Sequence, residues 1–258
     1  MTWDPVQYQR FGDERSRPFF ELVDRVPVEK PTVIFDLGCG PGPLTATLGA
    51  RWPGALVIGV DNDRAMIASA DAYATERTRF ALADLATWTP ELPADVIVAN
   101  AAFQWVPGHR HRLIAWMDML NPGGALAFQV PGNLDDAHHQ IIRALRASAR
   151  WRTVGRLAEL PERTHDSFRA AEYLDTLAPL SASVDAWETT YVHILSGTDP
   201  VLEWVKGTAL RPVLAALDDE DERTDFCADL APLLREAYPP RQWGTPFPFR
   251  RVFVVATR

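Results

Sequence analysis

TVIFDLGCGPGPL, residues 32–44, is the stretch that decides the fold. Residues 32–37 are an apolar run rich in β-branched side chains, which is typical of a buried strand in a parallel sheet. Gly38, Gly40 and Gly42 follow directly, and glycine permits a tight turn and a close approach of backbone to a ligand. A helix that starts after such a turn points its first N–H groups at the ligand. The segment therefore predicts a strand, a ligand-binding turn and a helix.

The same alternation of strand and helix continues along the first half of the chain. Further strands are predicted at residues 55–61, 79–83, 94–99 and 125–130, with helices at 44–51, 64–74 and 110–120 and a turn at 121–124. Strands that alternate with helices imply right-handed crossovers and a mostly parallel sheet. The predicted class is α/β with a doubly wound, Rossmann-like sheet.

The second half changes character. Helical patterns are predicted at residues 134–151, 166–178 and 200–217, strands at 187–195 and 249–256, and a solvated acidic turn at 218–222. An amphipathic helix is also predicted near the start, at residues 14–26. Helices above the carboxyl ends of the strands would cover a pocket there. We expect one domain, with a helical cap (1–30), a cofactor-binding core (31–132), and late strands plus a helical substrate lid (133–258).

Composition excludes several classes of protein. The 258 residues are 47% hydrophobic and 23% charged, which is ordinary for a soluble globular chain. The 26 basic and 34 acidic side chains argue against nucleic acid as a partner. No segment has the length of a membrane span or the form of a secretory signal, so we expect a cytoplasmic protein with no membrane partner, and favour a monomer. Cys39 and Cys227 do not form a metal-binding pattern, so no metal is expected.

Acidic residues end three successive predicted strands. Asp61 follows Gly42 by 19 residues, a position from which a carboxylate can take both hydroxyls of a ribose. Asp36 suits a cationic group, and Asp84 with Leu85 suits an adenine edge. Each acid alone could equally be a helix cap or a turn residue. The glycine spacing is wrong for a nicotinamide dinucleotide, because that fingerprint requires Gly-x-Gly-x-x-Gly.

At this point the chain resembles the S-adenosylmethionine-dependent methyltransferases with a Rossmann-like, seven-stranded sheet. The matching segments are VIFDLGCGPG, VIGVDNDRAMI, FALADLATW, ADVIVANAAFQWV and LNPGGALAFQV. Other segments are similar to the narrower trans-aconitate 2-methyltransferase family, and they run the length of the chain: WDPVQYQRFGDERSRPF, NAAFQWVPGHRHRL, WETTYVHIL, GTALRP and FPFRRVFVVA. The resemblance implies methyl transfer from S-adenosylmethionine to a carboxylate oxygen of trans-aconitate or a close polycarboxylate.

In that family the loop glycines and the acid matching Asp61 hold the cofactor, with support from the segment matching residues 100–105. The predicted cofactor-binding residues are Asp36, Gly38, Cys39, Gly40, Gly42, Asp61, Asn62, Met66, Asp84, Leu85, Asn100 and Ala101. The Cys39 thiol could be reactive at a helix N-terminus, but no partner base is visible. We interpret it as a small residue that the turn tolerates.

The acceptor side needs alignment and cationic groups more than a base. A carboxylate is already ionised at neutral pH, so no base is needed to activate it. The other carboxylates of the same acceptor can be bound bidentately by arginine. Candidate substrate-binding residues are Tyr8, Arg211, Trp243, Arg250 and Arg251. Because neighbouring strand residues face opposite ways, Arg250 and Arg251 do not easily share a pocket, and we favour Arg251.

Gln104 and Trp105 are predicted to line the reacting centre. His109 and His111 are interpreted as surface residues at the start of a helix.

Three alternatives stay open at the level of sequence. One is a methyltransferase for another small acceptor such as a phenol, which would favour a positioned base. Another is a nicotinamide-dependent oxidoreductase, which Pro43 and Asp36 disfavour. The third is a non-catalytic binder of adenosyl ligands, whose mark would be the loss of the pocket arginines.

Overall fold

The computed structural model describes residues 12–161 and 167–258, with side chains from residue 16 onward. The chain divides into two compact units. The first holds the described residues of Met1–Gly132, His165–Thr189 and Arg251–Arg258, and the second those of Asn133–Thr164 and Thr190–Arg250. The boundaries fall within two long strands, β6 (Ser183–Leu195) and β7 (Thr245–Thr257), so each strand contributes residues to both units.

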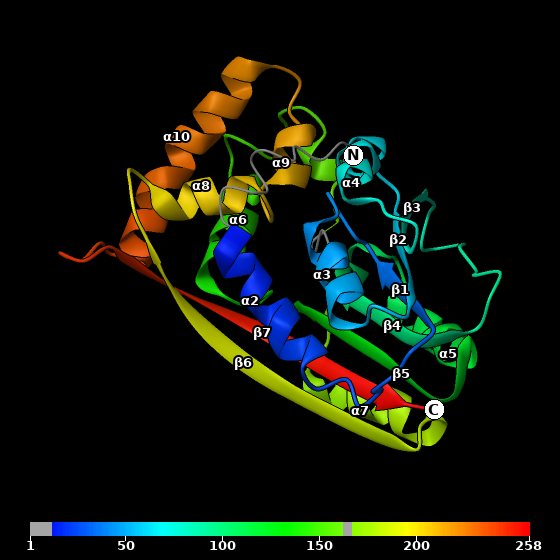
Figure 1. Ribbon diagram of the computed structural model, residues 1–258. Helices are drawn as coiled ribbons and strands as arrows, with labels where there is room; N and C mark the ends of the chain where they lie inside the picture. Colours follow the sequence, from blue (N-terminus) through cyan, green and yellow to red (C-terminus); the bar gives the residue numbers. More distant parts are fainter. Residues whose placement is uncertain (1–11, 162–166) are drawn as a thin grey trace. The chain divides into compact units, whose positions relative to one another are not determined.

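One seven-stranded sheet, in the order β3-β2-β1-β4-β5-β7-β6, organises the chain (Figure 1). The remaining strands are β1 (Val33–Leu37), β2 (Leu56–Asp61), β3 (Thr78–Leu82), β4 (Ala94–Asn100) and β5 (Leu120–Pro131). Strands β1 to β5 pair in parallel, whereas β5 and β7 are antiparallel. The predicted α/β class and the seven-stranded, mostly parallel sheet are confirmed. The strand order reverses between β1 and β4, where open α/β sheets bind ligands.

Helices cover both faces of this sheet in the first unit. They are α2 (Gly12–Val23), α3 (Pro43–Arg51), α4 (Arg64–Ala70), α5 (His109–Asp118) and α7 (Ala170–Leu177), with short 3₁₀ turns η1 (Asp71–Tyr73), η2 (Phe103–Trp105) and η4 (Ala178–Leu180). Trp116 of α5 and Tyr173 of α7 pack with Phe35 and Phe128 of the strands in the main core cluster. Helix α2 contacts β4 and β5.

Strand alternation explains which side chains avoid this core. Phe35, Leu37, Ile97, Ala99, Phe128, Val130, Val252 and Val254 all belong to the core cluster. Because successive strand residues point to opposite faces, their neighbours Asp36, Asn100, Gln129 and Arg251 point to the other face of the sheet. Each of these polar residues lies toward the carboxyl end of β1, β4 or β5, or on the antiparallel strand beside β5. The sheet therefore gathers polar groups on one face near its switch point.

The second unit is largely helical. Its elements are α6 (Ala137–Ala147), η3 (Leu157–Glu159), α8 (Pro200–Lys206), α9 (Arg211–Ala215) and α10 (Glu220–Ala237). Helix α10 contacts α6 and α8. His193 stacks on Trp204 with ring centroids 4.8 Å apart, which places it in the core of this unit.

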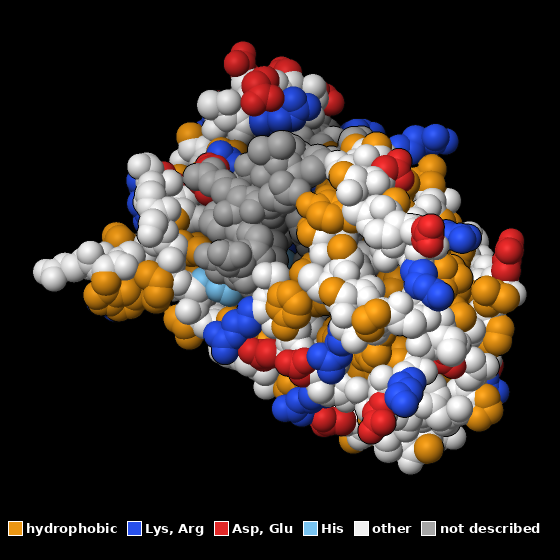
Figure 2. All heavy atoms as spheres, viewed as in Figure 1, with side chains coloured by type: hydrophobic (Ala, Val, Ile, Leu, Met, Phe, Trp, Pro, Cys, Tyr) orange, Lys and Arg blue, Asp and Glu red, His pale blue; other side chains and the backbone are white. Residues whose placement is uncertain are grey.

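Three sequence expectations are corrected. Residues 218–222 are not a solvated turn, because α10 begins there: the side chain of Asp219 accepts from the N–H of Glu222, and acids stabilise a helix N-terminus. Figure 2 shows acidic side chains gathered where α10 begins in Figure 1. The helix predicted at 200–217 is two helices, α8 and α9. The turn at 121–124 lies inside β5, at a shift in its register against β4 between Ala94 and Val96.

No helix among the described residues combines the length and the apolar character that crossing a bilayer would require.

Candidate functional site

The glycine loop joins β1 to α3 in a conformation that requires glycine. Gly38 has φ 78°, and a Cβ there would collide with the side chain of Ala102, just after β4. Gly40 has φ 55°, and a Cβ there would meet no atom within 4 Å. The loop is therefore tight on its Gly38 side and open at Gly40. Open space beside the glycine backbone is what a ligand lying against the loop needs.

Asp61, at the end of β2, is held against this loop by backbone N–H groups. Gly40 donates to its Oδ2 at 2.9 Å, and Asp63 donates to its Oδ1 at 2.9 Å. Burial raises the pKa of Asp61, although these hydrogen bonds oppose the rise. Each carboxylate oxygen keeps a further lone pair for another donor. A fixed pair of acceptors beside open space suits a vicinal diol.

Asp36, at the end of β1, is a buried acid without a cationic partner among the described residues. Its Oδ2 accepts from the hydroxyl of Thr45 at 2.6 Å. Burial raises its pKa to about 7, with Thr45 opposing the rise and the nearby Asp61 adding to it. A cationic ligand would relieve this electrostatic cost.

Cys39 lies beside these acids, and its buried surroundings disfavour the thiolate. Burial raises the pKa of the thiol far above neutrality, and Asp36 and Asp61 raise it further. Because the thiolate is the reactive form, Cys39 is no nucleophile at neutral pH. Its interpretation as a small residue that the turn tolerates is consistent with this burial and stays a prediction.

The segment after β4 faces the loop with polar groups. Ala101 has φ 53°, which is unusual for a residue with a side chain, and its N–H donates to the carbonyl of Gln129 at 2.9 Å. Gln104 is 4% exposed, and its Nε2 donates to the Ala101 carbonyl at 2.6 Å. Its Oε1 is buried and has no hydrogen-bond partner among the described residues. A buried acceptor of this kind is available to a donor on a ligand or to an ordered water. Trp105, next to it, is half-buried.

Arg251 is a buried cation on the polar face of the same sheet. It is 4% exposed, and its Nη1 donates to Oε1 of Gln129 at 3.1 Å. Gln129 in turn donates from Nε2 to Oδ1 of Asn100 at 2.6 Å. The structure thus links Arg251 to Asn100 through Gln129, a residue that the sequence analysis missed. The sequence feature that could have identified Gln129 is that it is the one amide in the otherwise apolar strand segment ALAFQV.

The other predicted residues near the loop differ in character. Met66 and Leu85 are buried, whereas Asn62 is exposed. Asp84 is exposed, and its Oδ1 accepts from the N–H of Ala86 at 2.9 Å. The Asp84 carboxylate therefore serves the turn after β3, and its role toward adenine stays a prediction.

Known proteins resemble this chain over nearly its full length. A family model described as a methyltransferase domain matches residues 34–124. Trans-aconitate 2-methyltransferase of Streptomyces avermitilis is 52% identical, with 99% of this chain and 96% of the relative covered. The protein of the same name from Rhodococcus jostii is 47% identical, with 98% of both chains covered.

The chain belongs to the trans-aconitate 2-methyltransferase family.

Solved structures agree with this family in fold. A SAM-dependent methyltransferase from Thiobacillus denitrificans, in complex with S-adenosyl-L-homocysteine, matches with a TM-score of 0.56 and 18% identity over 100% of both chains. YcgJ from Bacillus subtilis matches with a TM-score of 0.59 and 14% identity, covering 94% of this chain and 98% of its own. At these identities the likeness shows the fold alone.

The remaining predicted residues lie in the second unit or outside the described residues. Arg211 is half-buried at the start of α9. Arg250 is half-buried near Asp136: burial raises the pKa of that carboxyl, and Arg250 offsets part of the rise. Trp243 is 62% exposed in the turn before β7. Tyr8 lies outside the described residues, so its place is not assigned.

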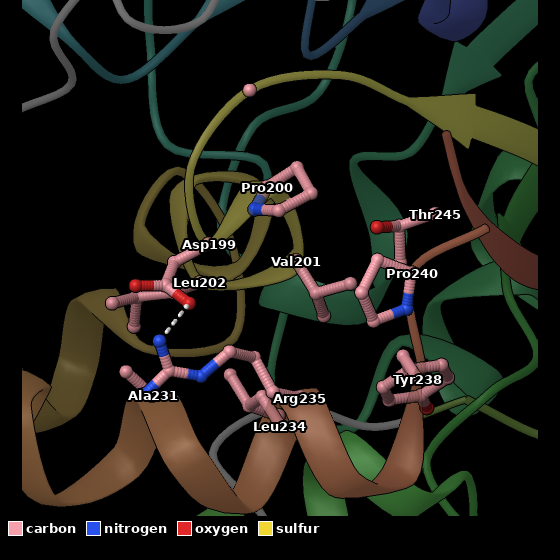
Figure 3. Close-up of a pocket in the computed structure, with 11 residues that line it drawn as sticks. Asp199, Pro200, Val201, Leu202, Ala231, Leu234, Arg235, Tyr238, Pro240 and Thr245 are labelled. Atoms are coloured by element: carbon pink, nitrogen blue, oxygen red, sulfur yellow. Dashed lines mark ion pairs between the residues drawn. The ribbon is translucent and has the colours of Figure 1, made fainter. Parts of the chain in front are cut away.

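A separate hollow lies within the second unit, between the start of α8 and the end of α10 (Figure 3). Its lining is mostly apolar, with Val201, Leu234 and Pro240 facing inward. Its charged groups, Arg235 and Asp199, form an ion pair with 3.3 Å between nitrogen and oxygen. No residue predicted from the sequence as part of the site lines this hollow.

His109 corrects one further expectation. It is fully buried instead of lying at the surface, and its Nε2 is 2.8 Å from the hydroxyl of Tyr173. The reason is helical spacing: His109, Leu113 and Trp116 fall on one face of α5, and that face packs on the sheet. His111, on the other side of the helix, is exposed as expected.

Proposed function

We propose that this chain transfers the methyl group of S-adenosylmethionine to a carboxylate oxygen of trans-aconitate, giving a monomethyl ester. The observation that carries the proposal is the identity of 52% over 99% of the chain to a relative named for that reaction. The proposal takes a small polycarboxylate as the partner and the cytoplasm as the place of reaction.

The residues around the glycine loop fit the proposed cofactor. Asp61 offers fixed acceptors for ribose hydroxyls, and the open space at Gly40 admits a ligand against the backbone. Asp36 has no cationic partner among the described residues, and the Oε1 of Gln104 has no hydrogen-bond donor there. The amino group and the sulphonium of S-adenosylmethionine carry positive charge, and the amino group is also a donor. The bound cofactor would contribute an electrophilic methyl group.

The main task of the protein in this reaction is to align the two reactants. The acceptor carboxylate is ionised at neutral pH, so no side chain has to remove a proton. The attacking oxygen must align with the methyl carbon and the sulphur, in a site that sheds water from the nucleophile. Because charge is neutralised as an anion attacks a sulphonium, strong stabilisation of the attacking oxygen would slow the step.

The carboxylates of the acceptor that do not react need fixed cationic donors. We propose Arg251 for this role, because it is a buried guanidinium on the polar face of the sheet, aligned by Gln129. Arg211, Arg250, Trp243 and Tyr8 remain further proposals for the acceptor site, and Gln104 and Trp105 for the reacting centre.

The test is methyl transfer from labelled S-adenosylmethionine to trans-aconitate, with cis-aconitate, citrate and isocitrate in parallel. We expect a base-labile methyl ester, formed preferentially on trans-aconitate. Transfer to none of these acids, with S-adenosylmethionine still bound, would overturn the proposed acceptor and point to another small molecule.

A further inference from the structure

Gln129 is a fully buried amide whose two ends bond to residues of different proposed roles. It is 0% exposed and lies on β5, between β4 and β7 in the sheet. Its Oε1 accepts from Arg251, proposed for the acceptor, and its Nε2 donates to Asn100, proposed for the cofactor. A buried polar side chain in an apolar strand has a desolvation cost, which these bonds offset.

The direction of these bonds follows from the arginine. A guanidinium carries only donors, so the Gln129 atom beside it must be the amide oxygen. The Nε2 group of Gln129 then faces Asn100, and a donor there requires the Oδ1 of Asn100 as its acceptor. The Nδ2 donors of Asn100 are what remain for a ligand, and they match a ligand oxygen. Arg251 therefore orients the amide of Asn100 through Gln129.

The backbone of Gln129 acts on the same segment. Asn100 and Gln129 are register partners across β4 and β5, and the carbonyl of Gln129 accepts from the N–H of Ala101. Ala101 is the residue with φ 53°, and its own carbonyl accepts from Gln104. The backbone of Gln129 thus fixes Ala101, the residue from which the turn with Gln104 and Trp105 begins.

We infer that Gln129 is a positioning residue that couples the two halves of the site: it presents the Nδ2 donors of Asn100 to the cofactor and holds the guanidinium of Arg251 for the acceptor. This inference rests on the proposed function, since it takes Asn100 and Arg251 as ligand-binding residues. It assigns Gln129 no contact with either reactant.

The test is a double-mutant cycle read by the dissociation constant of S-adenosylhomocysteine in titration calorimetry. Gln129→Met keeps the side-chain length and removes both hydrogen bonds. We expect it to weaken S-adenosylhomocysteine binding by about five- to tenfold, as for the loss of one oriented hydrogen bond. In an Asn100→Ala background the same change should have no further effect, because its route to the ligand is gone. Additive effects, or unchanged affinity in Gln129→Met, would overturn the inference.

Two further variants separate positioning from a general packing defect. Gln129→Glu keeps an acceptor for Arg251 but has no donor for Asn100, so its S-adenosylhomocysteine affinity should fall at least as far as in Gln129→Met. Val130→Ala, the buried neighbour on the opposite sheet face, should lower the unfolding temperature and leave the affinity unchanged. If Val130→Ala also weakened binding, the effect at Gln129 would be one of packing.

The acceptor arm uses steady-state kinetics with trans-aconitate. Gln129→Met should raise the KM for trans-aconitate more than it lowers kcat, because Arg251 loses its alignment. An unchanged KM would remove Gln129 from the acceptor side. If the wild-type chain fails to methylate trans-aconitate at all, the proposed function fails, whereas the S-adenosylhomocysteine cycle still decides the role of Gln129 toward Asn100.

Discussion

Asp61 is anchored by backbone N–H groups, and we propose that the same carboxylate binds the ribose of the cofactor. Its two oxygens accept from Gly40 and Asp63, so the carboxylate is fixed before any ligand arrives. Because the carboxylate is already fixed, less conformational entropy is lost when a ligand binds, which favours affinity. The Gly40 hydrogen bond also ties the glycine loop to the end of β2, so a change at Asp61 should alter both the loop and the proposed recognition of the ribose.

Replacement of Asp61 should therefore weaken cofactor binding whatever the acceptor is. Asp61→Ala removes acceptors for charged hydrogen bonds, and we expect the dissociation constant of S-adenosylhomocysteine to rise at least about tenfold. Calorimetry on the variant measures this change. Asp71→Ala, at an exposed aspartate of η1, is the matched control and should bind normally. Normal affinity in Asp61→Ala would contradict the assignment of the loop.

Asp36 predicts a pH dependence of cofactor binding. Burial raises its pKa to about 7 in the ligand-free protein, and a cationic ligand favours the ionised form. Below pH 7 binding must first remove a proton, so affinity for S-adenosylmethionine should rise as pH increases from about 6 to 8 and level off above. Calorimetry in buffers of different ionisation enthalpy would detect the released proton. Asp36→Asn should lose the slope; a wild-type affinity that is flat across this range would refute the assignment.

Arg251 allows the acceptor side to be tested apart from the cofactor. Arg251→Met keeps much of the side-chain length and removes the charge, and we expect the KM for trans-aconitate to rise about 10- to 100-fold. The dissociation constant of S-adenosylhomocysteine should change less than the KM, since the hydrogen bonds of the described residues link Arg251 to Asn100 indirectly, through Gln129. An unaltered KM in a variant that unfolds at a normal temperature would exclude Arg251 from the site.

Individual elements are joined by side chains that no periodic pattern reveals, and Asp95 of β4 is the clearest example. Its Oδ2 accepts from the N–H and hydroxyl of Thr32 and from the N–H of Val33, and its Oδ1 accepts from Asn121. One carboxylate therefore ties the start of β1 to the beginning of β5. Burial alone would raise the pKa of Asp95, but these hydrogen bonds outweigh it and lower the pKa to about 2.

The stability of the sheet should depend on this carboxylate. Because the pKa is lower in the folded state than in the unfolded chain, the stabilisation is full above about pH 4 and is lost as pH falls through 2. Asp95→Ala should reduce the free energy of unfolding at pH 7 by about 1 kcal/mol, because solvent screens this partly exposed carboxylate. Urea unfolding measures the loss, and the variant and wild type should converge at low pH. A constant difference across pH would show that the ionised form contributes nothing.

At the scale of the whole molecule, ligand binding should stabilise the sheet unit that holds the loop. A ligand at 100 times its dissociation constant adds about 2.7 kcal/mol to the folded state, which raises the unfolding temperature by about 5–10 °C for a chain of this size. S-adenosylhomocysteine is the probe in differential scanning calorimetry. Asp61→Ala at the same ligand concentration should show a much smaller rise, and equal rises would place the ligand elsewhere.

The sequence by itself determined the sheet, the glycine loop and the family. The sheet and the loop rest on local patterns: continuous apolar runs, the spacing of Gly38, Gly40 and Gly42, and acids at strand ends such as Asp61. The family rests instead on the resemblance of segments along the whole chain. Helix α10 was missed because its first turn is acidic, a composition that turns and helix N-termini share.

Only the tertiary structure decided which polar groups meet. Arg251, Gln129 and Asn100 are far apart along the chain and are joined by the register of three neighbouring strands, which no local pattern encodes. His109 was buried for a related reason, since its face of α5 is defined by what packs against it. Local conformation follows from nearby residues, whereas side-chain contacts between strands follow from the order and register in which the strands pair.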